Sequence, residues 1–109
     1  MEVSRGDIVI VALPGDYGKP RPAVVVQSRP FLTDFESVIV CPITSDPLRH
    51  SIARIVVSAS PANGLVHESR IMADKIMTIP KKRIPRVIGR LERPLLDQLD
   101  YALAALLGL

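Results

Sequence analysis

Short runs of β-branched and other apolar residues recur along the chain as far as Leu91, and each is closed by residues that favour turns. This pattern predicts strands over residues 8–13, 23–27, 37–42, 54–58, 69–79 and 86–91. The three consecutive valines at positions 24–26 predict that the second strand is central and buried on both faces. Gly89 weakens the case for the last strand, because glycine brings no side chain to pack.

The end of the chain follows a different period. From Pro94 onwards, leucines recur at the three- and four-residue spacing of an amphipathic helix. Pro94 suits the first helical turn, and Gly108 is a typical residue at a helix end. The sequence therefore predicts a fold that is mainly β with a C-terminal α-helix, a small antiparallel barrel with the helix laid against an opening.

The length of the chain predicts one domain over residues 1–109, because 109 residues rarely divide into two cores. No apolar run reaches the roughly 18 residues that a membrane-spanning helix needs. We expect a cytoplasmic protein that does not enter a membrane. Cys41 is the only cysteine, which excludes an internal disulfide, and its apolar neighbours predict a buried thiol.

Positive charge is concentrated in one segment. Residues 75–93 hold seven Lys and Arg side chains and a single acidic residue, Glu92, whereas the whole chain has a formal net charge of +3. Such a cluster attracts polyanions, either nucleic acids or acidic protein segments. The alternative is a solvated basic edge, because lysine often protects edge strands from pairing.

Polar residues suited to chemistry gather near the ends of the predicted strands. They are Arg21, Thr44, Ser45, Ser69, Arg70, Asp74 and Lys75. Loops at one end of a small barrel can bring such residues together. The sequence has no glycine-rich phosphate loop, and His50 and His67 lack further ligands at metal-binding spacing, so we expect no metal and no cofactor.

Several short sequence blocks follow one another along almost the whole chain. In order they are Arg5-Gly6-Asp7-Ile8-Val9, Arg21-Pro22-Ala23-Val24-Val25-Val26, Cys41-Pro42-Ile43-Thr44-Ser45, Ala73-Asp74-Lys75-Ile76 and Ile88-Gly89-Arg90-Leu91. Each block is common by itself. Together, their order and spacing resemble the MazF/PemK family of toxin–antitoxin ribonucleases.

The resemblance implies an SH3-like small antiparallel barrel of the CcdB/MazF/PemK type that forms a homodimer. It also implies a metal-independent endoribonuclease that cuts single-stranded RNA at short sequences and is neutralised by a cognate antitoxin protein. In the implied chemistry, the 2′-hydroxyl attacks the adjacent phosphorus and leaves a 2′,3′-cyclic phosphate and a 5′-hydroxyl. Because RNA supplies the nucleophile, the protein has only to orient it, move protons and stabilise charge.

The resemblance places three residues in the catalytic set. Arg21 matches the family's catalytic arginine, whose planar guanidinium can hold two phosphate oxygens. Thr44 matches a threonine whose hydroxyl can donate to a phosphate oxygen. Asp74 matches an acidic position that would accept the 2′-hydroxyl proton or orient Arg21. The alternatives are a solvated Arg21, a Thr44 that caps its own turn, and a strand-edge Asp74 paired with Lys75 or Arg70.

Five residues are candidates for binding RNA, namely Tyr17, Lys19, Ser45, Ser69 and Lys75. Many relatives carry glutamine where Lys75 stands and arginine where Met77 stands. These departures remove an amide that can read a base edge and a cation that can hold a phosphate. A histidine, His50 or His67, is then a candidate for the missing proton carrier.

Two other functions remain open from the sequence. The same barrel occurs in toxins that poison DNA gyrase without cutting nucleic acid, although this chain has no tryptophan, the usual mark of that branch. An inactive relative that binds only its antitoxin is the other alternative. The basic segment 81–93 suits either an RNA strand or an acidic antitoxin.

Overall fold

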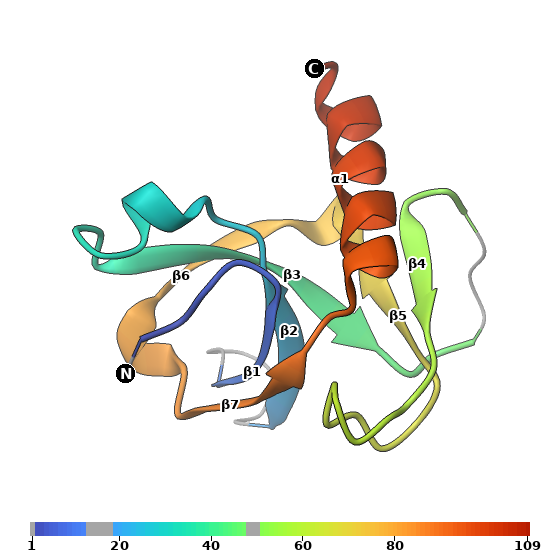
Figure 1. Ribbon diagram of the computed structural model, residues 1–109, viewed down its shortest axis with the longest axis horizontal. Coiled ribbons are helices and arrows are strands. Elements are labelled where there is room, and N and C mark those ends of the chain that lie inside the picture. Colours follow the sequence, from blue (N-terminus) through green and yellow to red (C-terminus); the bar gives the residue numbers. More distant parts are fainter. Residues whose placement is uncertain (1, 13–18, 48–50) are drawn as a thin grey trace.

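The computed structural model describes residues 2–12, 19–47 and 51–109. Its strands are β1 (Asp7–Ala12), β2 (Pro20–Val25), β3 (Ser37–Thr44), β4 (Arg54–Val57), β5 (Ser69–Met72), β6 (Met77–Pro80) and β7 (Arg86–Arg90). The helices are three single 3₁₀ turns, η1 (Arg29–Phe31), η2 (Ala73–Lys75) and η3 (Lys81–Arg83), and the α-helix α1 (Arg93–Leu107) (Figure 1). The predicted class, mainly β with a C-terminal helix, is confirmed.

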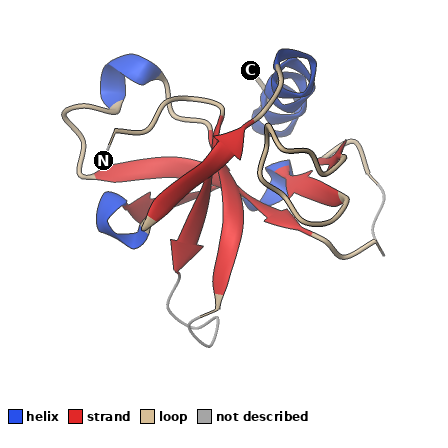
Figure 2. Cartoon of the chain, turned by 60° about the horizontal axis from the view of Figure 1, so that its bottom comes forward, coloured by secondary structure: helices blue, strands red, loops and turns tan. Residues whose placement is uncertain are grey.

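The strands form one antiparallel sheet that curls into an open half-barrel (Figure 2). The strand order is β4-β5-β3-β2-β1-β7, and β6 also pairs with β3. One edge of β3 pairs with β2, while its other edge pairs first with β6 and further along with β5. The sheet therefore changes direction along the length of β3, which stands at its centre.

Two apolar cores lie on opposite faces of β1, β2 and β3. In β2, Val24 belongs to one core and Ala23 and Val25 to the other, and all three are fully buried. This confirms that the strand is central and buried on both faces. Cys41 is also fully buried, and burial raises the pKa of its thiol to about 12, so the thiol stays protonated at neutral pH.

Residues 69–79 do not form the single long strand that the sequence predicts. β5 ends at Met72, η2 turns the chain, and β6 begins at Met77. The backbone N–H of Ala73 donates to the carbonyl oxygen of Ala53 (2.9 Å), and Ala73 is buried in the core that α1 covers. The prediction was wrong because it assumed one flat strand, whereas the curled sheet needs two strands on the same edge of β3.

β3 is longer than predicted and includes Pro42, the residue expected to end it. Pro42 lies opposite Ala23 of β2, in the gap between the stretches of β3 that pair with β6 and with β5. A residue without an N–H donor is tolerated where a ladder is interrupted. Thr44 is therefore the last residue of a strand rather than part of the following turn.

The amphipathic helix forms as predicted. α1 buries Leu96, Leu99 and Ala102 against the sheet and η2, and Pro94 lies in its first turn. Gly108 ends the helix in the left-handed conformation, with φ of 71°. Within the described part of the chain, no helix has both the length and the apolar character needed to cross a membrane.

Two glycines allow the turn after β4 to lie directly against β7. A Cβ at Gly89 would lie 2.3 Å from the carbonyl carbon of Asn63, and a Cβ at Gly64 would lie 2.2 Å from the carbonyl oxygen of Ile88. A backbone hydrogen bond from Arg90 N–H to the Ala62 carbonyl oxygen (2.9 Å) joins the same two segments. The glycine that weakened the strand prediction is therefore the residue that permits this contact.

We expect Gly89→Ala to lower the free energy of unfolding by about 2–3 kcal/mol, because the new Cβ overlaps backbone atoms that cannot rotate away. Urea titration of the purified protein measures this. Gly108→Ala is the control, because a Cβ at position 108 would meet no atom within 4 Å. Its loss of unfolding free energy should be about 1 kcal/mol, which is the strain of an alanine in the left-handed conformation. Equal losses in the two variants would contradict the packing argument.

Candidate functional site

A pocket of about 280 Å³ opens at the end of the sheet where β2 begins and β3 ends. Its polar lining residues are Arg21, Thr44, Ser45, His67, Ser69 and Arg86. Ile10, Leu65 and Ile88 contribute apolar surface to the same pocket. Residues from β2, β3, β5, β7 and the turn before β5 thus meet in one hollow, as expected for loops at one end of a small barrel.

Arg21 and Thr44, the first two predicted catalytic residues, both line this pocket. Arg21 is exposed near the start of β2, and Thr44 is half-buried at the end of β3. The hydroxyl oxygen of Thr44 accepts the backbone N–H of Asp46 (3.1 Å). A hydroxyl has one proton to donate and two lone pairs, so this turn bond leaves the proton of Thr44 available to a ligand.

The turn that enters β5 is held by side chain to backbone hydrogen bonds. The Oδ1 atom of the buried Asn63 accepts the backbone N–H of Ser60 and of Leu65, both at 3.0 Å, and its amide nitrogen donates to the Ser58 carbonyl oxygen (2.8 Å). The hydroxyl of Ser69 donates to the carbonyl oxygen of His67 (2.8 Å). Ser69, which was predicted to bind RNA, is buried, and its hydroxyl proton is used in this hydrogen bond within the turn.

Asp74 does not line the pocket; it lies on η2 and pairs with Arg54. Its carboxylate accepts from Nε of Arg54 at 2.9 Å and from Nη2 at 3.1 Å. The bidentate geometry holds both oxygens of Asp74. Lys75, on the same turn, is exposed and also lies outside the pocket lining.

The remaining predicted binding residues have different positions. Ser45 is exposed and lines the pocket, and Lys19 is exposed just before β2 without lining it. Tyr17 and His50 lie outside the described residues. Within residues 2–12, 19–47 and 51–109, no group of three His, Cys, Asp or Glu side chains is arranged to hold a metal ion.

Arg86 lines the pocket, although the sequence marks it only as one cation of the basic segment. It is exposed at the start of β7 and brings a second guanidinium to the pocket. Two other cations of the segment have structural partners. Arg90 pairs with Asp7 (2.8 Å), and the ammonium of Lys81 donates to the Leu32 carbonyl oxygen. The pairing of β7 with β1 decides which cation of the segment reaches the pocket. No local sequence signal predicts this pairing.

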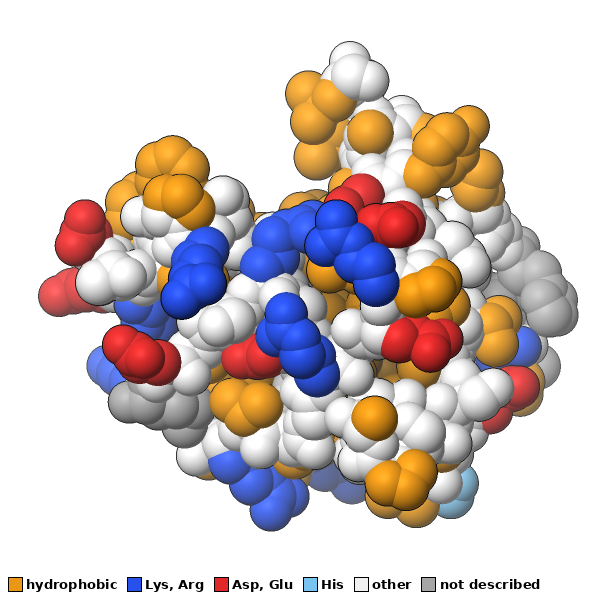
Figure 3. All heavy atoms as spheres, in the orientation of Figure 1, with side chains coloured by type: hydrophobic (Ala, Val, Ile, Leu, Met, Phe, Trp, Pro, Cys, Tyr) orange, Lys and Arg blue, Asp and Glu red, His pale blue; other side chains and the backbone are white. Residues whose placement is uncertain are grey.

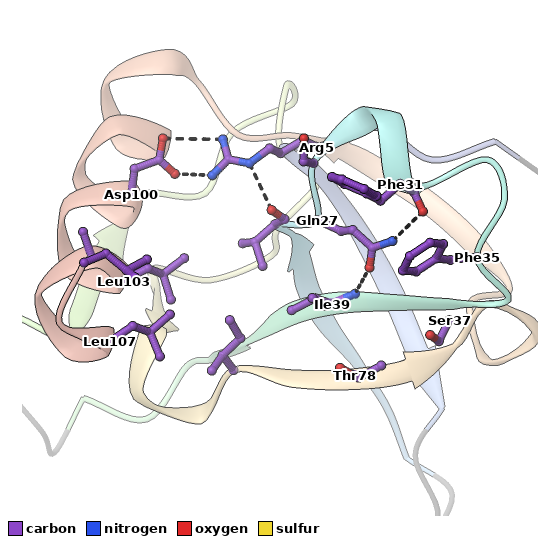
Figure 4. A pocket seen from close by; sticks show the side chains of 15 residues that line it. Arg5, Gln27, Phe31, Phe35, Ser37, Ile39, Thr78, Asp100, Leu103 and Leu107 are labelled. Atoms are coloured by element: carbon purple, nitrogen blue, oxygen red, sulfur yellow. Dashed lines mark hydrogen bonds and ion pairs between the residues drawn. The ribbon is translucent and has the colours of Figure 1, made fainter.

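A second hollow, an apolar groove of about 740 Å³, lies between α1 and η1. Leu103 and Leu107 of α1 face Phe31 and Phe35 across it, above Ile39 of β3 (Figure 4). Hydrophobic side chains flank this hollow on the molecular surface (Figure 3).

Polar groups fix the walls of the apolar groove. Asp100 and Arg5 form an ion pair at one end, and Nε of Arg5 also donates to the Val26 carbonyl oxygen (3.0 Å) (Figure 4). The amide of Gln27 donates to the Phe31 carbonyl oxygen (2.8 Å) and accepts from the N–H of Ile39 (2.9 Å). The groove is therefore built into the fold.

Comparison with known families identifies the chain. Residues 4–107 match the family described as PemK-like, MazF-like toxin of type II toxin–antitoxin system. The chain belongs to this family. A relative in Mycolicibacterium smegmatis, named probable endoribonuclease MazF, is 37% identical over 106 residues, which are 96% of each protein. The toxin is thus classed with the MazF endoribonucleases, and the resemblance inferred from the sequence blocks is confirmed.

Solved structures agree with this assignment. The Mycobacterium tuberculosis toxin MazF-mt6 is 28% identical, with a TM-score of 0.81 over 94% of this chain and 97% of that one. An endoribonuclease from mycobacterial species, solved in complex with its cognate antitoxin, is 21% identical, with a TM-score of 0.82 over 99% of this chain and 97% of that one. The toxin therefore has the MazF fold, and the predicted barrel type is confirmed.

The position of Asp74 leads to a prediction. We expect the RNA cleavage rate of Asp74→Asn to stay within about threefold of that of the unmodified toxin. Its free energy of unfolding should fall by about 1 kcal/mol, because the substitution removes a partly exposed ion pair. Initial cleavage rates and urea titration measure the two effects. Asp97→Asn, which breaks an exposed pair with Arg93 on α1, should change neither. A hundredfold loss of cleavage with unchanged stability would instead place the Asp74 carboxylate in catalysis.

Proposed function

We propose that this toxin cleaves single-stranded RNA by metal-independent transesterification. The 2′-oxygen bonds to the adjacent phosphorus while the bond from phosphorus to the 5′-oxygen breaks, which gives a 2′,3′-cyclic phosphate and a 5′-hydroxyl. The observation that carries the proposal is the meeting of Arg21, Thr44 and Arg86 in one open pocket. Two cations and a hydroxyl donor suit a phosphate whose charge grows in the transition state.

Arg21 and Arg86 provide the charge. Each guanidinium presents donors in a planar fork that can hold two phosphate oxygens, and both side chains are exposed at the pocket. Because they come from β2 and β7, they can approach one phosphate from different sides. Guanidinium groups stay protonated at neutral pH, so their role is to stabilise charge rather than to accept a proton.

Thr44 supplies a neutral donor beside the two cations. Its oxygen is oriented by the Asp46 N–H, and its proton can then point to a non-bridging phosphate oxygen. Ser45, the next residue, is exposed and lines the same pocket, and we propose that it contacts the neighbouring nucleotide. Lys19 and Lys75 are proposed to bind the strand outside the pocket, and Tyr17 stays a predicted RNA-binding residue.

The proposed partners are a cognate antitoxin and a second copy of the toxin. The mycobacterial endoribonuclease of the same fold was solved with its antitoxin, which supports the first. The exposed cations on η3 and β7 suit an RNA strand and an acidic antitoxin segment alike, because both are polyanions. The apolar groove beside α1 supports the second, because exposed apolar surface rimmed by polar residues marks sites of protein–protein contact.

Removal of either catalytic side chain should abolish most of the activity. We expect Arg21→Ala and Thr44→Val to slow cleavage by about 10²–10³-fold, and Arg21→Lys to remain impaired because lysine lacks the bidentate fork. The assay uses a mixed RNA in excess chelator, with 5′-hydroxyl ends detected by their need for phosphorylation before ligation. Arg29→Ala, which removes an exposed cation on η1 outside the pocket, is the control and should cut normally.

Other outcomes of this assay would exclude the proposal. Full activity in Arg21→Ala would remove the assigned site, and loss of activity in chelator would contradict metal independence. Intact RNA with stalled DNA gyrase would indicate the gyrase-poisoning alternative. Neither activity would indicate a toxin relative that only binds its antitoxin.

Dimerisation through the groove is tested separately. We expect sedimentation of a dimer at micromolar concentration and of a monomer for Leu107→Glu, because a carboxylate in the apolar groove has no partner to offset its desolvation. Leu106→Glu is the matched control, because Leu106 is exposed on the same helix turn without lining the groove. A monomeric unmodified toxin, or a monomeric Leu106→Glu, would contradict this assignment.

A further inference from the structure

The proposed reaction needs a group that moves protons, and none of the residues assigned so far performs this step. The 2′-hydroxyl must lose a proton as its oxygen bonds to phosphorus, and the 5′-oxygen must gain one as it leaves. We propose that His67 is the proton-transfer residue of this pocket. The inference rests on the proposed RNA cleavage and adds a catalytic residue to it.

The chemistry of the pocket lining favours His67 over the other polar groups. Arg21 and Arg86 hold their protons too tightly to accept or release one readily, and the hydroxyls of Thr44 and Ser45 are weak acids. None of the residues that line the described pocket is an Asp or a Glu. Among the residue types present, imidazole alone exchanges protons readily at neutral pH.

The position of His67 also fits this role. Its side chain is exposed, and within the described residues its imidazole makes no hydrogen bond or ion pair. Its main chain is fixed, because the His67 carbonyl accepts the Ser69 hydroxyl and Asn63 holds the preceding turn. A fixed backbone with an imidazole open to the pocket suits proton exchange with a bound substrate.

The structure weakens the rival assignment of this step to Asp74. Both carboxylate oxygens of Asp74 are bonded to Arg54, and the residue does not line the pocket. His67 thus takes the role that the sequence resemblance gave to Asp74.

The step balances with water as the only further reactant. One proton leaves the 2′-oxygen and one arrives at the 5′-oxygen for each bond exchange at phosphorus. Neutral imidazole can accept the first while water supplies the second, or imidazolium can donate the second while water accepts the first. Either way the histidine returns to its starting state when the proton is exchanged with water.

The test compares His67→Ala with the unmodified toxin on one short RNA. We expect a loss of about 10²–10⁴-fold in the cleavage rate, partly restored by added imidazole, which diffuses into the space left by the side chain. Arg21→Ala is the control, and imidazole should not restore it, because its defect is one of charge. Thermal unfolding of each variant verifies that the fold is intact.

A second substrate separates the two proton transfers. In RNA with sulfur in place of the bridging 5′-oxygen, the leaving group needs no proton. If His67 donates the proton, His67→Ala should cut this substrate nearly as fast as the unmodified toxin does; if His67 accepts the proton, the defect should persist and imidazole should still relieve it.

Several outcomes would overturn the assignment. His67→Ala at the unmodified rate, full activity in His67→Gln, or a defect that neither imidazole nor the sulfur substrate relieves would each exclude proton transfer by this residue. In these cases the unmodified toxin still cuts RNA, so the proposed function stands. If the unmodified toxin cuts no RNA, the proposed function fails, and this inference fails with it.

Discussion

Backbone pairing along both edges of β3 is the interaction on which the rest of the structure depends. One edge binds β2, and the other binds β6 and then β5, so three strands are positioned by a single one. The change of partner along β3 curls the sheet and separates the two apolar cores. It also separates β5 from β6, which pair antiparallel with successive stretches of the same edge and are joined by the η2 turn.

The same pairing creates the pocket. β2 and β3 are antiparallel, so the start of β2 lies beside the end of β3. Their register places Ala23 opposite Pro42, and two residues further along it would place Arg21 opposite Thr44. A guanidinium and a hydroxyl from positions 23 residues apart thereby line one hollow. β7 and the turn held by Asn63 complete that hollow with Arg86 and His67.

The fold class, the C-terminal helix, the central second strand and the meeting of Arg21 and Thr44 at one end of the barrel could all be predicted from the sequence. These features depend on short-range patterns and on blocks typical of the family. The sequence groups Asp74 with the site because Asp74 belongs to such a block. Membership of a block does not determine the direction in which a side chain points. The η2 turn aims its carboxylate at Arg54 instead. Arg86 was indistinguishable from its basic neighbours, because only the pairing of β7 with β1 selects it.

The sequence by itself determined that the chain is mainly β with a C-terminal helix, that the second strand and Cys41 are buried, and that a cation and a hydroxyl stand at strand ends. Periodicity and turn residues act within a few positions, so they can be interpreted without coordinates. Only the tertiary structure decided which polar side chains share a pocket and which form ion pairs or turn hydrogen bonds elsewhere. Those outcomes depend on contacts between distant segments, such as β3 with β5 and the Gly64 turn with β7, whose register no local pattern encodes.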